Sequence, residues 1–231
     1  AASIISEILS KAGFNMNFAP VLDLKRFDTK AIGDRSFCKD YKKVSKYGLI
    51  QINEYKAKKI IAVAKHFPGH GATNQDSHFT LSVIKKSYEE LEKEDILPFK
   101  IAMQNGADAM LVGHLMIPEI TKTNPASLSK KFIGDYIRKK YRYNKLLITD
   151  DLKMRSIRLF YGETRAVKKA FEAGNDIIVF RYKKDKEKRA IQNLLHLYDK
   201  NIGRVNRSVI RILKEKEKYN VNDEEVIPSI N

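Results

Sequence analysis

The sequence is poor in cysteine, glycine and proline, and it has no long apolar run. The single cysteine, Cys38, excludes an intrachain disulfide framework and a metal site built from several thiolates. Eleven glycines and six prolines among 231 residues are too few for a fibrous or disordered chain. No stretch reaches the roughly 20 apolar residues that a membrane-spanning helix needs. These absences predict a globular chain of one domain without a membrane partner. We expect it to be a monomer, although no feature of the sequence determines the oligomeric state.

The first residue is Ala1, which already lies in a helical pattern, and no signal-peptide pattern is present. We therefore expect the natural N-terminus to lie upstream. The cytoplasm is the expected location, with export left open because an upstream signal would not be seen.

Acidic residues are scarce relative to basic ones: 28 Asp and Glu stand against 44 Lys and Arg, a net charge of +16. The segment 181–218 has 13 basic and 5 acidic residues, which is half of the excess. Such a balance suits either a polyanionic partner or a lysine-rich surface without one. The sequence lacks zinc-finger spacing, an aromatic RNA-binding motif and a helix-turn-helix signature. We therefore expect no nucleic-acid partner.

Short apolar runs alternate with amphipathic segments along the chain. The runs lack strict alternation of polar and apolar residues, which is typical of parallel strands buried on both faces. This order predicts an α/β fold with a parallel sheet. The expected strands are Phe14–Leu22, Ile60–Ala64, Ala107–Val112, Leu146–Thr149 and Asp176–Phe180. The expected helices are Tyr41–Lys58, Tyr88–Gln104 (with a kink or second start at Pro98), Ser129–Tyr141, Thr164–Ala173, Lys186–Leu197 and Arg204–Tyr219.

An open doubly wound sheet and a (β/α)8 barrel both fit this alternation. No GxGxxG turn follows any strand, which weakens the case for a nucleotide-binding open sheet. Polar residues instead follow several strand ends, as catalytic groups do in a barrel. We predict a TIM-like (β/α)8 barrel over residues 1–220, incomplete because its first βα units are missing, and a polar tail at 221–231. The polar strand-end residues are Asp23, Lys65, His66, His114, Asp150 and Asp151.

The most informative segment begins at Lys65 and ends at His78. It follows an expected strand, and its proline and glycines predict an irregular loop. Three histidines in it are compatible with zinc, but they lie on a loop without HExxH spacing or thiolates, so we expect no metal. Asp76 and His78 suggest an acid/base pair, because a carboxylate can fix the tautomer of a ring that titrates near neutral pH. The alternative is an Asx-turn beside an exposed histidine.

A second candidate site is the pair Asp150 and Asp151, which directly follows an apolar run. Adjacent side chains of an extended chain point in opposite directions. One carboxylate is therefore expected to face the site, while the other braces the loop or caps the following segment.

Arg35 is a third candidate, because it lies on a glycine-containing loop after the first expected strand. A guanidinium there is suited to clamp substrate oxygens. The alternative is a surface salt bridge with Asp34 or Asp40.

Together these strings resemble glycoside hydrolase family 3, and within it the bacterial β-N-acetylhexosaminidases. The resemblance extends from near residue 1 to about residue 218. Its most specific part is AKHFPGHGATNQDSH at 64–78, which matches the family's KHFPGHG string followed by a D-x-H pair. Further matches are NFAPVLD at 17–23, IGDRSF at 32–37 and TDDLKM at 149–154, with weaker ones at 173–179 and 204–214.

The resemblance implies a TIM-like barrel that carries out retaining hydrolysis of a terminal, non-reducing β-linked N-acetylglucosamine, with no cofactor. By position in the motifs, Asp150 would be the nucleophile and His78 the general acid/base, assisted by Asp76. Muropeptide fragments in peptidoglycan recycling would be the substrates. The residues that contact the sugar would be Arg35, Lys65 and His66.

One departure from the family is the absence of its preceding D-x-EGG-x-V-x-R string, which supplies a further sugar-binding aspartate and an arginine. We therefore expect the 231 residues to be a fragment with an incomplete sugar site. Two other functions stay open. One is a β-N-acetylglucosaminide phosphorylase of the same family, in which phosphate replaces water. The other is a basic cell-wall or nucleic-acid binding module without catalysis.

Overall fold

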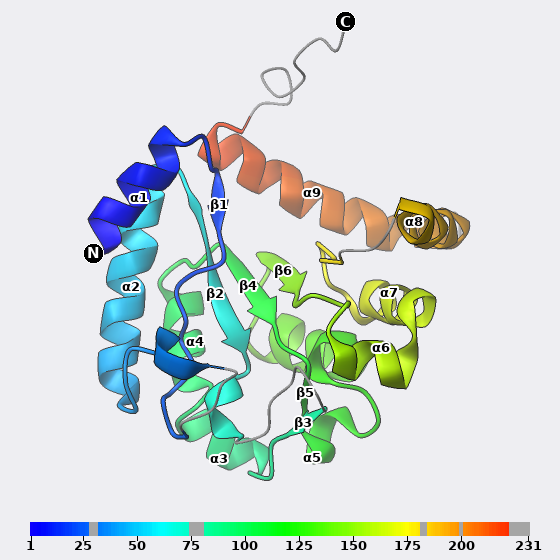
Figure 1. Ribbon diagram of the computed structural model, residues 1–231, viewed down its shortest axis with the longest axis horizontal. Coiled ribbons are helices and arrows are strands. Elements are labelled where there is room, and N and C mark those ends of the chain that lie inside the picture. The colour runs from blue at the N-terminus through cyan, green and yellow to red at the C-terminus, as the bar shows by residue number, and fades with distance from the viewer. Residues whose placement is uncertain (28–31, 74–80, 181–183, 199–200, 222–231) are drawn as a thin grey trace, which may run out of the picture.

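The centre of the molecule is a parallel sheet whose strands follow one another in chain order (Figure 1). The structure, a computed structural model, describes residues 1–27, 32–73, 81–180, 184–198 and 201–221. In spatial order the strands are β1 (Met16–Asn17), β2 (Ile61–Phe67), β4 (Ala109–Val112) and β6 (Leu146–Thr149).

Each successive strand is added on the same side of the sheet, and a bridge from Ile148 to Ile177 extends the series. A doubly wound sheet would reverse its order at a switch point, whereas a barrel does not. The predicted α/β fold, in the form of an incomplete barrel, is therefore confirmed.

Helices surround this sheet and fill most of the connections between strands (Figure 1). None in the described part of the chain combines the length and apolarity needed to cross a membrane. They are α1 (Ala2–Lys11), α2 (Tyr41–Ala57), α3 (Tyr88–Lys93), α4 (Leu97–Gln104), α5 (Pro118–Thr121), the π-helix η4 (Phe132–Lys140), α6 (Arg155–Tyr161), α7 (Glu163–Ala173), α8 (Lys184–Tyr198) and α9 (Ile202–Tyr219).

Alternate residues of each strand belong to two different cores. Ala64 of β2 and Leu147 of β6 lie in the outer core, which the side chains of α2, α4 and η4 complete. Ile61 of β2 and Leu146 of β6 lie in the inner core, which Tyr219 of α9 helps to cover. Because both faces are buried, the strands appear in the sequence as continuous apolar runs.

Two predicted strands are shorter than expected. The run Phe14–Leu22 pairs regularly only at β1, because Pro20 has no N–H with which to continue the ladder; Val21 then forms a single bridge. The run Asp176–Phe180 forms no regular strand. The N–H groups of Asp176 and Ile177 both donate to the Leu147 carbonyl, which breaks the even spacing of a parallel ladder.

The predicted helix Tyr88–Gln104 is divided into α3 and α4. Pro98 lies in the first turn of α4, so it marks a second start. A small parallel pair, β3 (Ser82–Val83) with β5 (Leu115–Met116), was not predicted. The predicted tail is outside the described residues from 222 onwards.

Asp176 joins β6 to the helices on both sides of it. Its side chain is fully buried and accepts hydrogen bonds from Arg138 Nη2 at 2.6 Å, from Arg211 Nη1 at 3.0 Å and from the Leu147 N–H at 3.0 Å. The Ser208 hydroxyl donates a further bond at 2.5 Å. One carboxylate thus connects η4, β6 and α9.

We expect Asp176→Ala to lower the free energy of unfolding by roughly 3–5 kcal/mol, because it leaves two largely buried guanidinium groups unpaired. Urea denaturation measures this change. Asp135→Ala is the matched control, because it removes a half-exposed carboxylate paired with Lys139 and should cost less than about 1 kcal/mol. Equal destabilisation by the two substitutions would contradict the role of Asp176.

Candidate active site

Polar side chains gather at the carboxyl ends of β2 and β6. Lys65 and His66 lie near the end of β2, and Asp150 directly follows β6. The Asp150 N–H donates to the Val112 carbonyl at the end of β4, which fixes its height relative to the sheet. Because parallel strands end at the same edge, residues far apart in sequence come together here.

The Asp23 carboxylate ties the segment after β1 to the end of β2. It is fully buried and accepts hydrogen bonds from the N–H and Nδ1 of His66, at 3.0 and 2.7 Å, and from the His70 N–H at 2.6 Å. Burial would raise the pKa of Asp23, but His66 and the hydrogen bonds from His66 and His70 hold it below its usual value. The ionised carboxylate therefore keeps the His66 proton on Nδ1 and leaves Nε2 for a ligand.

The loop after β2 lies tightly against the chain that carries Asp23. A Cβ atom at Gly71 would lie 1.9 Å from the carbonyl oxygen of Leu24, so only glycine fits this position. The contact fixes the path of the chain up to Thr73. Asp76 and His78, the predicted acid/base pair, lie outside the described residues.

Asp150 is an ionised carboxylate near the carboxyl end of β2. Burial would raise its pKa, but His66, the hydrogen bond from the Asp151 N–H and Lys65 lower it. Lys65 responds in turn: burial and the charge of Arg35 lower the pKa of Lys65, while Asp150 and Asp23 act to raise it. The carboxylate is therefore available as a nucleophile or a base at neutral pH.

The two aspartates of the turn after β6 have different surroundings. Asp150 is the carboxylate whose pKa its neighbours lower. Asp151 Oδ1 instead accepts from the Lys153 N–H at 2.9 Å and closes the turn.

The His114 side chain supports the turn after β6 through a hydrogen bond. Its Nε2 lies 3.1 Å from the Asp151 carbonyl oxygen, so this nitrogen carries a proton. Burial lowers the pKa of His114 although Asp150 is nearby, so the ring is neutral and its Nδ1 accepts from the Ser127 hydroxyl at 2.7 Å. Asn175 Nδ2 donates to the Ser127 carbonyl at 2.8 Å, which extends the network to the end of α7.

Arg35 and Lys65 line the same cavity, which measures about 680 Å³. Phe18, Phe37 and Tyr47 contribute aromatic surface to it, and the rings of Phe37 and Tyr47 are 5.8 Å apart. Aromatic walls with a few charged groups are typical of small-molecule sites.

The two carboxylates considered as surface partners of Arg35 are engaged elsewhere. Asp34 pairs with Lys25 at 2.8 Å, and Asp40 accepts from the Lys42 N–H at the start of α2. Arg35 Nε donates to the Ile32 carbonyl at 3.2 Å, and the role of Arg35 as a sugar contact stays a prediction.

Sequence reasoning identified Asp23 and His114 as strand-end residues but gave them no role, and it missed Ser127 and Asn175. The signal for Asp23 and His114 was a polar residue directly after an apolar run. Ser127 and Asn175 act through contacts between segments 13 and 48 residues apart, for which the sequence has no local signal. No group of three metal-ligating side chains is present among the described residues.

Comparison with known proteins gives several β-hexosaminidases as relatives. A β-hexosaminidase of Nitrosomonas eutropha is 30% identical over 176 residues, which is 76% of this chain and 50% of that protein. A β-hexosaminidase of Hydrogenovibrio crunogenus is 33% identical over 174 residues, covering 75% and 48%. The chain therefore spans about half the length of these relatives.

Solved structures agree in fold. A glycoside hydrolase family 3 β-N-acetylglucosaminidase from Paenibacillus sp. str. FPU-7 superposes with a TM-score of 0.91 at 32% identity, covering 100% of this chain and 44% of that one. The β-N-acetylglucosaminidase from Thermotoga maritima gives 0.82 at 26% identity, covering 96% and 47%. Residues 1–214 match the profile of the glycosyl hydrolase family 3 N-terminal domain. The chain belongs to this family.

Proposed function

We propose that the protein to which this chain belongs hydrolyses terminal, non-reducing β-linked N-acetylglucosamine with retention of configuration. The observation that carries the proposal is the Asp150 carboxylate, which follows β6 and is kept ionised by His66, the hydrogen bond from the Asp151 N–H and Lys65. The names of the relatives support the class of substrate.

Two groups perform the chemistry in this proposal. Asp150 attacks the anomeric carbon and forms a covalent glycosyl-enzyme intermediate, while His78, assisted by Asp76, donates a proton to the leaving oxygen. His78 then takes a proton from the water that releases the sugar, so both groups return to their starting states.

Three further residues bind the sugar in this proposal. Lys65 and His66 contact its hydroxyl groups, and Arg35 contacts the same ring from the wall of the 680 Å³ cavity. The proposal extends to muropeptide fragments as substrates and peptidoglycan recycling as the role, supported by the resemblance of the string at 64–78.

Asp150→Ala in the full-length protein should lower kcat/KM for a chromogenic N-acetylglucosaminide by on the order of 10³-fold or more, because the attacking group is lost. Asp151→Ala is the matched control and should lose less than about tenfold, since it removes only a turn-closing contact. Circular dichroism verifies that both variants are folded. Near-native turnover of Asp150→Ala would remove the nucleophile assignment.

His78→Ala should slow the hydrolysis of an unactivated disaccharide by roughly 10²–10⁴-fold. Formation of the glycosyl-enzyme from an activated aryl glycoside should suffer much less, because a good leaving group needs little protonation. Burst kinetics on both substrates give this comparison. The exposed His196 provides the control through His196→Ala. Equal losses on the two substrates would contradict the acid role.

Lys65→Met should move the acidic limb of the kcat/KM profile to higher pH. The lysine helps to hold the pKa of Asp150 down, and a carboxylate that loses a neighbouring cation is protonated at a higher pH. The exposed Lys85 provides a control of the same size in Lys85→Met, which should leave the limb in place. Identical limbs in the two variants would show that Lys65 does not influence the nucleophile.

A further inference from the structure

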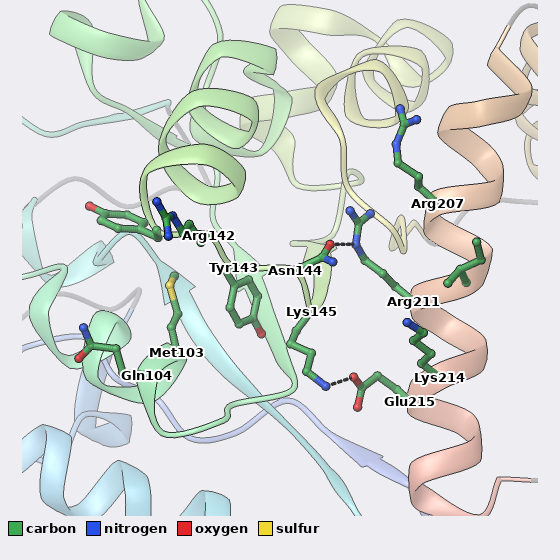
Figure 2. A pocket seen from close by; sticks show the side chains of 12 residues that line it. Met103, Gln104, Arg142, Tyr143, Asn144, Lys145, Arg207, Arg211, Lys214 and Glu215 are labelled. Carbon is green, nitrogen blue, oxygen red and sulfur yellow. Dashed lines mark hydrogen bonds and ion pairs between the residues drawn. The ribbon is translucent and has the colours of Figure 1, made fainter.

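A second cavity lies at the other end of β6 from Asp150. It has a volume of about 600 Å³ and is enclosed by α9, the end of α4 and the loop 141–145 that leads into β6 (Figure 2). Lys145 in its wall directly precedes β6, and Asp150 directly follows this strand. This cavity, which we call the basic groove, therefore has no part in the proposed hydrolysis, and that chemistry does not explain it.

The lining of this groove is strongly basic. Five of its twelve lining residues are Arg or Lys, and Glu215 is the one acidic residue among them. Lys145 pairs with Glu215 at 2.7 Å, and Arg211 pairs with Asp176 at 3.0 Å. Within the described residues, three lining cations have no acidic partner within 4 Å: Arg142, Arg207 and Lys214.

Three of the five lining cations, including the paired Arg211, come from α9. Arg207, Arg211 and Lys214 are spaced four and three residues apart, so they form one row on α9 that faces the loop 141–145 (Figure 2). Seven residues of helix separate the ends of the row by roughly 10 Å. Arg142, on the loop 141–145, adds a further cation to the lining.

The walls of the groove are held in place by contacts behind them. Arg138 Nη1 donates to the carbonyls of Tyr143 and Lys145 at 2.8 and 2.7 Å, and the Tyr143 hydroxyl donates to the Ala107 carbonyl at 2.9 Å. The Asn144 side chain accepts from Arg211 Nε at 2.7 Å, which links loop and helix. A site fixed in this way loses little conformational entropy when a ligand binds.

We propose that this groove binds a compact organic phosphate with two or more negative charges. Guanidinium groups match phosphate oxygens in shape and charge, and the row on α9 is long enough for more than one phosphate. Met103 and Ile210 supply apolar wall beside the cations, where a ring of the ligand can lie. The volume is that of a small-molecule site, which favours a compact ligand over a polymer.

Isothermal titration of the full-length protein with inorganic tripolyphosphate and with UDP tests the proposal, with uridine as the uncharged probe. We expect both anions to bind and uridine not to bind. The variant Arg142→Gln/Arg207→Gln/Lys214→Gln should weaken both anions by at least about tenfold. The control Lys39→Gln/Lys43→Gln/Lys46→Gln removes the same charge from exposed side chains near the start of α2 and should change affinity by less than about twofold.

Each other outcome overturns the proposal in a defined way. Equal weakening in the two triple variants would mean that net charge alone attracts the anions. Binding of tripolyphosphate without UDP would reject the organic part of the ligand, and binding of neither would reject the site. Hydrolysis of a chromogenic N-acetylglucosaminide by the variants is a separate measurement, so failure of the proposed hydrolase function is distinguishable from failure of this site.

Discussion

The ionised carboxylate of Asp23 is the contact on which the rest of the site depends. It is buried, and it accepts three hydrogen bonds from His66 and His70, which lie 43 and 47 residues further along the chain. A buried carboxylate is unfavourable unless its oxygens are satisfied. The backbone after β2 can therefore take only a path that brings these N–H groups to it. The orientation of His66, and the close approach of Gly71 to Leu24, follow from that requirement.

Burial and neighbouring polar or charged groups act on both Asp150 and His114, but with different outcomes. Burial favours the neutral form of each. At Asp150 the cationic neighbours and the Asp151 N–H outweigh it, and the carboxylate stays ionised. At His114 burial outweighs the nearby carboxylates, and the ring stays neutral. This combination keeps one negative charge at the end of β6, where the proposed mechanism needs a nucleophile, and uses an uncharged ring to support the turn.

Local patterns in the sequence predicted the parts of the structure that local rules control. Buried parallel strands appear as apolar runs, so β2, β4 and β6 were found within a few residues, and the residues after them indicated where the site lies. The sequence could not predict that the segment 176–180 forms no regular strand, because this depends on which N–H groups reach the Leu147 carbonyl. The roles of Asp23 and Ser127 depend on contacts between distant segments, and no local pattern reports these. Asp76 and His78 stay predictions.

The shortness of β6 limits how the chain can change in length. Its first three residues alternate between the two cores, and the polar Thr149 ends the strand, with Lys145 before it and Asp150 after it. Deleting or inserting one residue would turn every later side chain to the opposite face, so the Asp150 carboxylate would exchange places with the side chain of an adjacent residue, Thr149 or Asp151. Length variation among natural homologues should therefore be confined to the helical side of each unit.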